Sequence, residues 1–158
     1  MKDLRLLITE EDTWTATEGE NENIPFLLRF RPHLQSFIET KEYNKRLVIS
    51  WNYESEDDSL LPSKQDMELM EEVENSLVDS FETDVQAVLA FVYTGNNLRE
   101  WHWYTRDITE TGHRLNEALA DFERLPVGLV AEDDEEWEEY HAVLEGADYS
   151  DYEESEEE

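Results

Sequence analysis

The chain has 158 residues, of which 42 are acidic and 12 are basic, so its formal net charge is −30. Because nucleic acids and anionic membranes attract cations, this balance argues against direct binding to either of them. The sequence has no cysteine, which excludes disulfides, thiolate nucleophiles and zinc–thiolate sites.

The length is typical of one domain with a substantial core, and we expect a single α+β domain over residues 1–146. Residues 132–158 contain 15 acidic residues and neither lysine nor arginine, so this segment carries half of the net charge. Residues 147–158 have too few apolar side chains to order themselves, which predicts a disordered acidic tail. No segment is long and apolar enough for a secretory signal or a membrane span, and we therefore expect a cytoplasmic protein.

The N-terminal part of the chain predicts an apolar arm and then a β-hairpin. Residues 4–8 are mostly apolar and fit either a strand or a packed arm. Two β-prone segments, residues 14–18 and 24–31, flank a polar turn at residues 19–23, an arrangement typical of a hairpin. This hairpin must either extend the main sheet or cover its other face.

A strand and an amphipathic helix follow the hairpin. Residues 32–45 are ambiguous, whereas residues 46–53 alternate as a strand does, and residues 54–61 form an acidic loop. Ser63 is a suitable N-cap for a helix. The buried stripe of that helix is expected, from its three- and four-residue spacing, to consist of Met67, Met70, Val73, Leu77 and Phe81.

A second hairpin is predicted in the middle of the chain, from residues 88–93 and 98–104 around the turn Gly95-Asn96-Asn97. Because the first of these strands is apolar on both faces, we expect it to be covered on both and to avoid the edge of the sheet. Strict alternation assigns one face to Leu89, Phe91 and Tyr93, and the other face to Val88, Ala90 and Val92.

The remaining elements complete an α+β pattern. Asp107 can cap a helix over residues 108–123, and a strand at residues 127–131 and a short acidic helix around Trp137 come after it. From residue 46 the order is therefore β-α-β-β-α-β, which predicts a ferredoxin-like sandwich with two helices on one face of an antiparallel sheet. The N-terminal hairpin and the short C-terminal helix are additions to it.

Several short segments form a set that spans roughly residues 12–144. They are Trp14, Glu18-Gly19-Glu20, Pro25, Arg29-Phe30-Arg31, Trp51-Asn52-Tyr53, residues 67–74, the TGxxLREW run from Thr94 to Trp101, Tyr104-Thr105, and the DxxWxxY run from Asp134 to Tyr140. Together they resemble a bacterial family known only as domain of unknown function 695. The chain departs from the family in its turn at residues 95–97, which is less glycine-rich than usual, and in its more acidic loop at residues 54–61.

The resemblance implies a fold and no established activity. Some relatives are similar in architecture to an acidic protein inhibitor of ribonuclease E, or are fused with a domain like it. This analogy favours protein binding, although a fold does not fix a function.

Arginines on or beside strands are the most distinctive candidates for a site in so acidic a chain. A guanidinium at a fixed strand position is a planar partner for a carboxylate. Two interpretations remain open: internal pairing with Glu18, Glu20, Glu100 or the acidic C-terminal helix, or an anion-binding floor flanked by Trp101 and Trp103. The candidate binding residues are Arg29, Arg31, Arg99, Trp101, His102 and Trp103.

The sequence contains none of the common catalytic or cofactor motifs. Its five glycines are isolated, so no phosphate-binding loop is present, and no G-x-S-x-G elbow occurs. The histidines lack metal-ligand spacing, and His102 fits a hydrogen-bonded strand residue better than a general base. We therefore expect no catalytic residue, no cofactor and no metal site.

These observations predict a non-enzymatic, acidic protein-binding or regulatory domain of inhibitor or adaptor kind, with a basic protein as its partner. The alternative is a small-anion or ligand-binding domain, or an enzyme, that uses the arginine and tryptophan cluster of the central hairpin.

Overall fold

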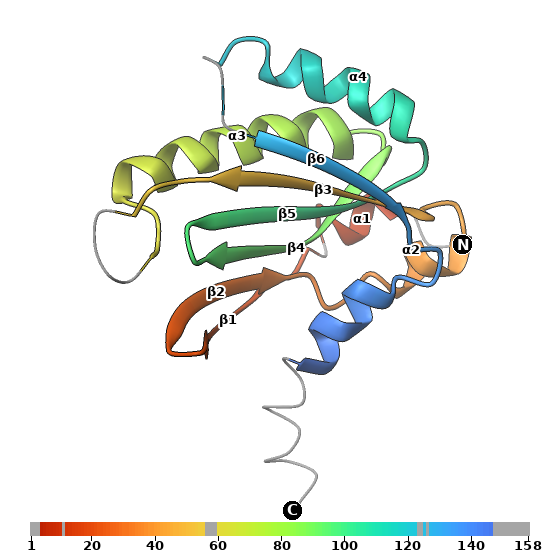
Figure 1. Cartoon of the computed structure of the whole chain (residues 1–158). Helices are drawn as coiled ribbons and strands as arrows, with labels where there is room; N and C mark the ends of the chain where they lie inside the picture. The colour runs from red at the N-terminus through yellow and green to blue at the C-terminus, as the bar shows by residue number, and fades with distance from the viewer. Residues whose placement is uncertain (1–3, 11, 56–59, 123–124, 126, 147–158) are drawn as a thin grey trace, which may run out of the picture.

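The computed structural model describes residues 4–10, 12–55, 60–122, 125 and 127–146, so the predicted tail at residues 147–158 lies outside the described residues. Helices flank one six-stranded antiparallel sheet in a mixed α+β structure (Figure 1). The helices are α1 (Leu4–Leu7), α2 (Gln35–Thr40), α3 (Lys64–Glu82) and α4 (Ile108–Leu119), and residues 138–146 are also helical. The strands are β1 (Thr15–Asn21), β2 (Ile24–Phe30), β3 (Lys45–Asn52), β4 (Ala87–Gly95), β5 (Leu98–Thr105) and β6 (Val127–Asp133).

The strands lie in the order β1-β2-β4-β5-β3-β6. The N-terminal hairpin extends the sheet, because β2 pairs with β4 in antiparallel register. Strand β4 lies between β2 and β5, and residues 87–92 are buried on both of its faces, which confirms the expectation for this doubly apolar strand. Among the described residues, β1 and β6 form the two edges of the sheet.

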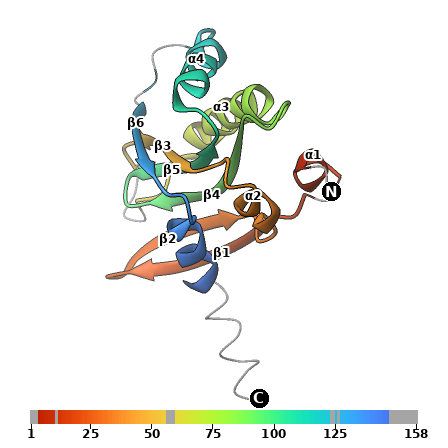
Figure 2. The same cartoon turned by 90° about the vertical axis from the view of Figure 1, so that its right-hand side faces the viewer.

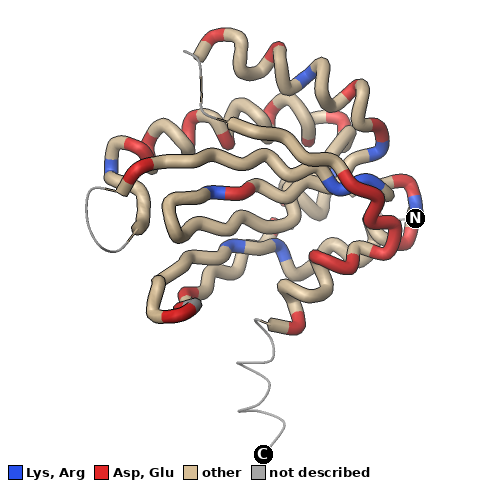
Figure 3. The backbone as a smooth tube through the Cα atoms, in the orientation of Figure 1, with Lys and Arg blue, Asp and Glu red and all other residues tan. Residues whose placement is uncertain are grey.

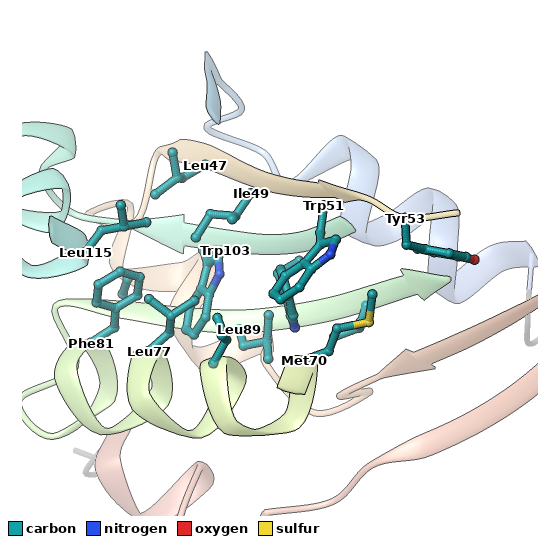
Figure 4. Close-up of a cluster of buried hydrophobic side chains, with 14 residues drawn as sticks. Leu47, Ile49, Trp51, Tyr53, Met70, Leu77, Phe81, Leu89, Trp103 and Leu115 are labelled. Carbon is teal, nitrogen blue, oxygen red and sulfur yellow. The ribbon is translucent and has the colours of Figure 1, made fainter. Parts of the chain in front are cut away.

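Each face of the sheet has its own apolar core. We call the side covered by α3 and α4 the α3 face, and the side covered by α2 and residues 138–146 the α2 face (Figures 1 and 2). The tryptophans of β3 and β5 lie on the α3 face against the buried stripe of α3 (Figure 4). The main members of this core are Leu47, Ile49, Trp51, Tyr53, Met70, Val73, Leu77, Phe81, Leu89, Trp101 and Trp103.

Strand β4 does not follow the strict alternation predicted from the sequence. A bulge between Leu89 and Phe91 shifts the pairing with β5, so that Leu89 lies opposite Trp103 and Phe91 lies opposite His102. Leu89 and Val92 therefore belong to the α3 face, whereas Phe91 joins the core on the α2 face. An extra residue in one strand reverses the facing of every residue after it.

The predicted features of the two long helices are confirmed in most respects. The Ser63 hydroxyl accepts a hydrogen bond from the amide of Asp66 at 3.1 Å, and the Asp107 carboxylate accepts one from the amide of Glu110 at 3.1 Å. Of the predicted stripe on α3, four residues are fully buried and Met67 is half-buried. Helix α4 ends at Leu119 rather than at residue 123, because the amides of Ala120 and Phe122 bond three residues back in tight turns.

Two other local expectations were correct only in part. Gly95 is the last residue of β4 and does not adopt a positive φ; the turn consists of Asn96 and Asn97, with φ of 50° and 65°. Gly95 is instead required for space, since a Cβ there would lie 2.8 Å from the Cβ of Phe26 and 3.0 Å from the carbonyl oxygen of Pro25. The apolar N-terminal segment is the short helix α1 and not a strand, and its Leu7 packs in the core of the α2 face.

The DxxWxxY segment, from Asp134 to Tyr140, attaches the C-terminal helix at residues 138–146 to the α2 face. The carboxylate of Asp134 accepts hydrogen bonds from the amides of Glu138 (2.7 Å) and Glu139 (3.3 Å) and from the hydroxyl of Tyr104 (2.6 Å). Trp137 stacks on Tyr104, with ring centroids 3.9 Å apart and planes 8° from parallel. Tyr140 donates its hydroxyl to the carbonyl of Arg31 at 2.6 Å. This segment of the family resemblance therefore has a structural role.

Candidate functional site

The sheet separates the six candidate binding residues instead of gathering them. Arg29, Arg99, Trp101 and Trp103 lie on the α3 face, because the register places Arg29 opposite Val92 and Val92 opposite Trp101. His102 points to the α2 face, where it stacks on Phe91 at 4.1 Å between ring centroids. Arg31 follows the end of β2 and has its own set of partners.

Arg31 is a structural residue. Its buried guanidinium makes five hydrogen bonds: two to the carboxylate of Asp12, two to the carboxylate of Glu82 and one to the carbonyl of Leu89. Burial acts against its charge, but Glu82 and Asp12 together raise the pKa of Arg31. Burial also raises the pKa of Glu82, whereas Arg31 and the amide of Leu89, which bond to it, act in the opposite direction. All five guanidinium donors are used, so none remains for a ligand.

His102 is likewise bonded within the fold. Arg46 lies 3.2 Å from its Nδ1, and Glu100 lies 3.1 Å from its Nε2. Because arginine can only donate, Nδ1 must be the acceptor, and the proton on Nε2 then points to Glu100. This matches the hydrogen-bonded strand histidine that the sequence favoured.

The two tryptophans of β5 are fully buried beneath α3 and provide no binding surface. Trp103 packs edge-on against Phe81 at 4.8 Å between ring centroids (Figure 4). Its indole nitrogen has no hydrogen-bond partner among the described residues. The indole of Trp101 donates to Oε1 of Glu74 at 2.9 Å.

Arg29 and Arg99 are the two candidates that the fold brings to one place. Arg29 donates to the same Oε1 of Glu74, at 2.5 Å, and is half-exposed. Arg99 is only 6% exposed; its Nε donates to the hydroxyl of Thr94 at 2.9 Å, and its Nη2 lies 3.4 Å from the sulfur of Met67. The described residues provide no ion-pair partner for Arg99.

These two arginines line a hollow of about 680 Å³ on the α3 face. The register of the sheet determines which residues form the floor of this hollow. Paired residues on neighbouring strands form one row across the sheet, which consists of Glu18, Leu27, Thr94 and Arg99. Ala16, Arg29 and Val92 form the next row, and Met67 of α3 completes the lining. A smaller hollow of about 390 Å³ shares Arg29, Met67 and Arg99, and its other lining residues come from α3: Lys64, Glu68, Glu71, Glu74 and Asn75.

A second candidate surface lies at the opposite edge of the sheet. Leu129 and Val130 of β6 are 51% and 54% exposed and are the large apolar residues most exposed among the described residues. Seven of the eight residues from Glu132 to Glu139 are acidic; the run begins with the last two residues of β6 and continues beyond the strand (Figure 3). Lys45 and Arg46 pair with Asp133 and Glu132, whereas Glu135, Glu136, Glu138 and Glu139 are exposed.

Internal pairing of the arginines, one of the two sequence interpretations, is correct for Arg29, Arg31 and Arg46. The expected partners Glu18, Glu20 and Glu100 were wrong, whereas Arg46 does pair with Asp134, which caps the C-terminal helix, at 3.5 Å. The carboxylates come from α3, from Asp12 and from the end of β6. Glu74 is the main residue of this site that the sequence did not predict. Its position in the sequence could have indicated this role, because it lies four residues after Met70 and three before Leu77 and therefore on the buried side of the helix.

Two searches of the described residues were negative. They contain no group of three or more histidine, aspartate or glutamate side chains placed to hold a metal ion. None of the described helices combines the length and apolar character needed to cross a lipid bilayer.

Comparison with known proteins places this architecture in a family. Residues 12–145 match a family of unknown function, DUF695, and the chain belongs to that family. The match covers every strand of the sheet and both candidate surfaces. No curated protein matches the chain.

Proposed function

We propose that this chain is a non-enzymatic, acidic protein-binding domain of regulatory, inhibitor or adaptor kind, and that its partner is a basic protein. The observation that supports this proposal is the edge strand β6. It combines two exposed apolar side chains, Leu129 and Val130, with the acidic run from Glu132 to Glu139. An edge strand has unpaired backbone donors and acceptors, which another chain can use.

The partner would add an extended segment to the outer side of β6. In this mode of recognition the backbone hydrogen bonds supply affinity, and alternate side chains supply specificity. Apolar residues of the partner would contact Leu129 and Val130, and lysine or arginine would follow beside Glu135, Glu136 and Glu139. Because these carboxylates are exposed and close together, they would mainly increase the association rate and the selectivity.

The experiment compares two variants with the same net charge. In the edge variant Glu135, Glu136 and Glu139 become Gln; in the control variant Glu68, Glu71 and Glu72 on the outer side of α3 become Gln, and all six are exposed. The partner is recovered at low ionic strength and purified, and its association rate with each variant is measured by stopped-flow at increasing salt. We expect the edge variant to associate about tenfold more slowly at low salt, and the control variant to match the wild type.

Equal rates for the two variants would show that net charge alone matters and would refute the β6 surface. An association rate that salt does not change would refute the charged partner.

The finer description of the fold is also a proposal. Strands β3 to β6 with α3 and α4 form a ferredoxin-like sandwich, and the order β4-β5-β3-β6 with both helices on one face supports this.

We also propose a bacterial origin and a cytoplasmic location; the absence of cysteine fits a reducing compartment. The alternative function, small-anion binding, is supported by a separate observation at Arg99.

A further inference from the structure

Arg99 is a buried cation without an ion-pair partner among the residues that the structure describes. Five other arginines, Arg29, Arg31, Arg46, Arg106 and Arg114, each form an ion pair with a carboxylate. Arg99 is more buried than Arg29, Arg106 or Arg114, yet its guanidinium contacts no carboxylate among the described residues: it bonds to the hydroxyl of Thr94 and the sulfur of Met67 and lies over the ring of Trp101, 5.7 Å from its centroid. In a protein with 42 carboxylates, this arrangement leaves donors of Arg99 available.

The charge of Arg99 persists under physiological conditions. Burial lowers the pKa of Arg99 to about 10, and the positive charge of Arg29 acts in the same direction, while Glu74 opposes them. A pKa near 10 leaves the guanidinium protonated at neutral pH. A buried charge without an ion-pair partner is unfavourable, and an anion that binds beside it would relieve that cost.

The hollow beside Arg99 can accommodate such an anion together with an apolar body. Leu27, Val92 and Met67 line it along with Arg99, and its volume of about 680 Å³ lies in the range of small-molecule sites. The hydroxyl of Thr94 fixes Arg99 through Nε, and Nη2 lies 3.4 Å from the sulfur of Met67, so three of the four terminal N–H groups have no hydrogen-bond partner among the described residues and can bind a ligand. An apolar floor with a single fixed cation fits an amphipathic ligand better than a fully polar one.

The charges around the hollow limit the ligand to a single negative charge. Glu74 pairs with Arg29, so Arg99 is the cation of the lining that has no ion-pair partner among the described residues. Glu18 lines the same hollow, and Glu68, Glu71 and Glu74 line the smaller one next to it together with Lys64. A doubly charged phosphate would meet these carboxylates, whereas a monocarboxylate matches one guanidinium.

We infer that the hollow bounded by Arg99, Thr94, Leu27, Val92 and Met67 binds an organic monocarboxylate with an apolar body. The carboxylate bonds to the terminal nitrogens of Arg99, and the apolar body lies along Leu27 and Val92. A free aliphatic acid and the C-terminus of a peptide share this chemistry. The site lies towards β1, at the edge of the sheet opposite β6, so it is independent of the protein-binding surface.

The test is titration calorimetry of the full chain with octanoate, with octanamide as the neutral analogue and inorganic phosphate as the dianion. N-acetyl-leucine and its amide represent a peptide C-terminus. We expect the carboxylates to bind about tenfold or more tightly than their amides, because a hydrogen bond to a charged group is lost in the amide. Octanoate should also raise the melting temperature, since it binds only the folded state. Whichever acid binds more tightly identifies the source class.

Three variants locate the site. Arg99→Met removes the charge and keeps the length of the side chain, and Leu27→Trp fills the hollow without changing Arg99; each should weaken octanoate binding about tenfold or more. Arg114→Met removes one charge on α4, and it should bind octanoate as the wild type does.

Several results would overturn the inference. They are no octanoate binding by the wild type, equal binding of octanoate and octanamide, tighter binding of phosphate, or unchanged binding by either Arg99→Met or Leu27→Trp in a folded variant.

Discussion

Arg31 and Arg99 show how differently one type of side chain can be used within a single sheet. Both are almost fully buried, but Arg31 is enclosed by two carboxylates and a carbonyl, whereas Arg99 contacts Thr94 and Met67. Truncating Arg31 would leave Glu82 as a buried charge without its cation, a change that typically costs about 3–5 kcal/mol. Arg99 has no such dependent partner, so stability and binding can be separated at this residue.

The contact between Glu100 and His102 predicts a pH-dependent contribution to stability. The hydrogen bond from His102, together with the positive charge of Arg46, lowers the pKa of Glu100. A carboxyl whose folded pKa is lowered stabilises the protein above its unfolded pKa, and this contribution is lost as the pH falls through the folded value. Glu100→Gln should therefore be less stable than the wild type at pH 7, by about 1 kcal/mol or less for a half-buried pair. The difference should begin to shrink as the pH falls below about 4.3, the usual pKa of glutamate, and should vanish below the lowered folded value.

Urea denaturation of both proteins between pH 3 and pH 8 measures this difference. Glu139→Gln, at an exposed position, is the control and should change little at any pH. A stability difference for Glu100→Gln that stays constant with pH would contradict the assignment.

Individual partners were harder to predict from the sequence than residue types. The arginines on strands and the buried tryptophans were visible as patterns, but their partners were not. Glu74 and Glu82 are 45 and 51 positions from Arg29 and Arg31. Pairings over such distances depend on how α3 lies across the sheet, and periodicity within one segment contains no information about that.

At the scale of elements, the last helix shows that a short segment can be held by a few directed contacts. Residues 138–146 are too few for a helix to be stable in isolation. Asp134 supplies the cap, and Trp137 and Tyr140 attach the segment to Tyr104 and to the backbone of Arg31. Trp137 adopts a positive φ of 57°, which is unfavourable for a bulky side chain and is tolerated because its ring and its indole nitrogen are both held.

Trp137→Ala should release this helix. Removing a fully buried tryptophan typically costs about 3–5 kcal/mol. The amides of residues 138–146 should then exchange rapidly, while those of α3 remain protected. Hydrogen exchange with mass spectrometry checks this outcome, and Glu136→Ala, at an exposed neighbour, is the control. If the amides of residues 138–146 stay protected in Trp137→Ala, the contacts of Asp134 and Tyr140 alone hold the helix.

Elements governed by local rules were predicted well, and those governed by pairing were not. The caps at Ser63 and Asp107 and the stripe of α3 depend on residues within a few positions of one another, so they could be read directly. The bulge in β4 depends on the register that β5 imposes, and the face of Phe91 was therefore predicted incorrectly. The hollow beside Arg99 needs residues from β1, β2, β4, β5 and α3, and no single segment predicts it.

At the scale of the whole molecule, the net charge of −30 works against a compact fold. Like charges repel one another more strongly in the folded state, where they are closer together. Added salt screens this repulsion, since the Debye length falls from about 10 Å at 0.1 M to about 3 Å at 1 M.

The melting temperature should therefore rise with sodium chloride between 0.05 M and 0.5 M. A gain of about 1 kcal/mol corresponds to about 2–4 °C for a chain of this length. Differential scanning calorimetry measures the shift, and the variant with Gln at Glu135, Glu136 and Glu139 should show a smaller rise. A melting temperature that is flat or falls with salt would mean that the surface ion pairs outweigh the net repulsion.

The pairing of β6 with β3 also has a consequence for synthesis. Lys45 and Asp133 are partners in the register although they lie 88 positions apart, so β3 emerges from the ribosome long before β6 does. Until β6 is made, the edge of β3 that will pair with it has no neighbouring strand, so its backbone donors and acceptors are exposed to other chains. Contacts between residues so far apart in the sequence form slowly, and a strand whose edge is still unpaired is prone to aggregation. We therefore expect the yield of native protein to depend on how quickly residues 127–133 are synthesised and pair with β3.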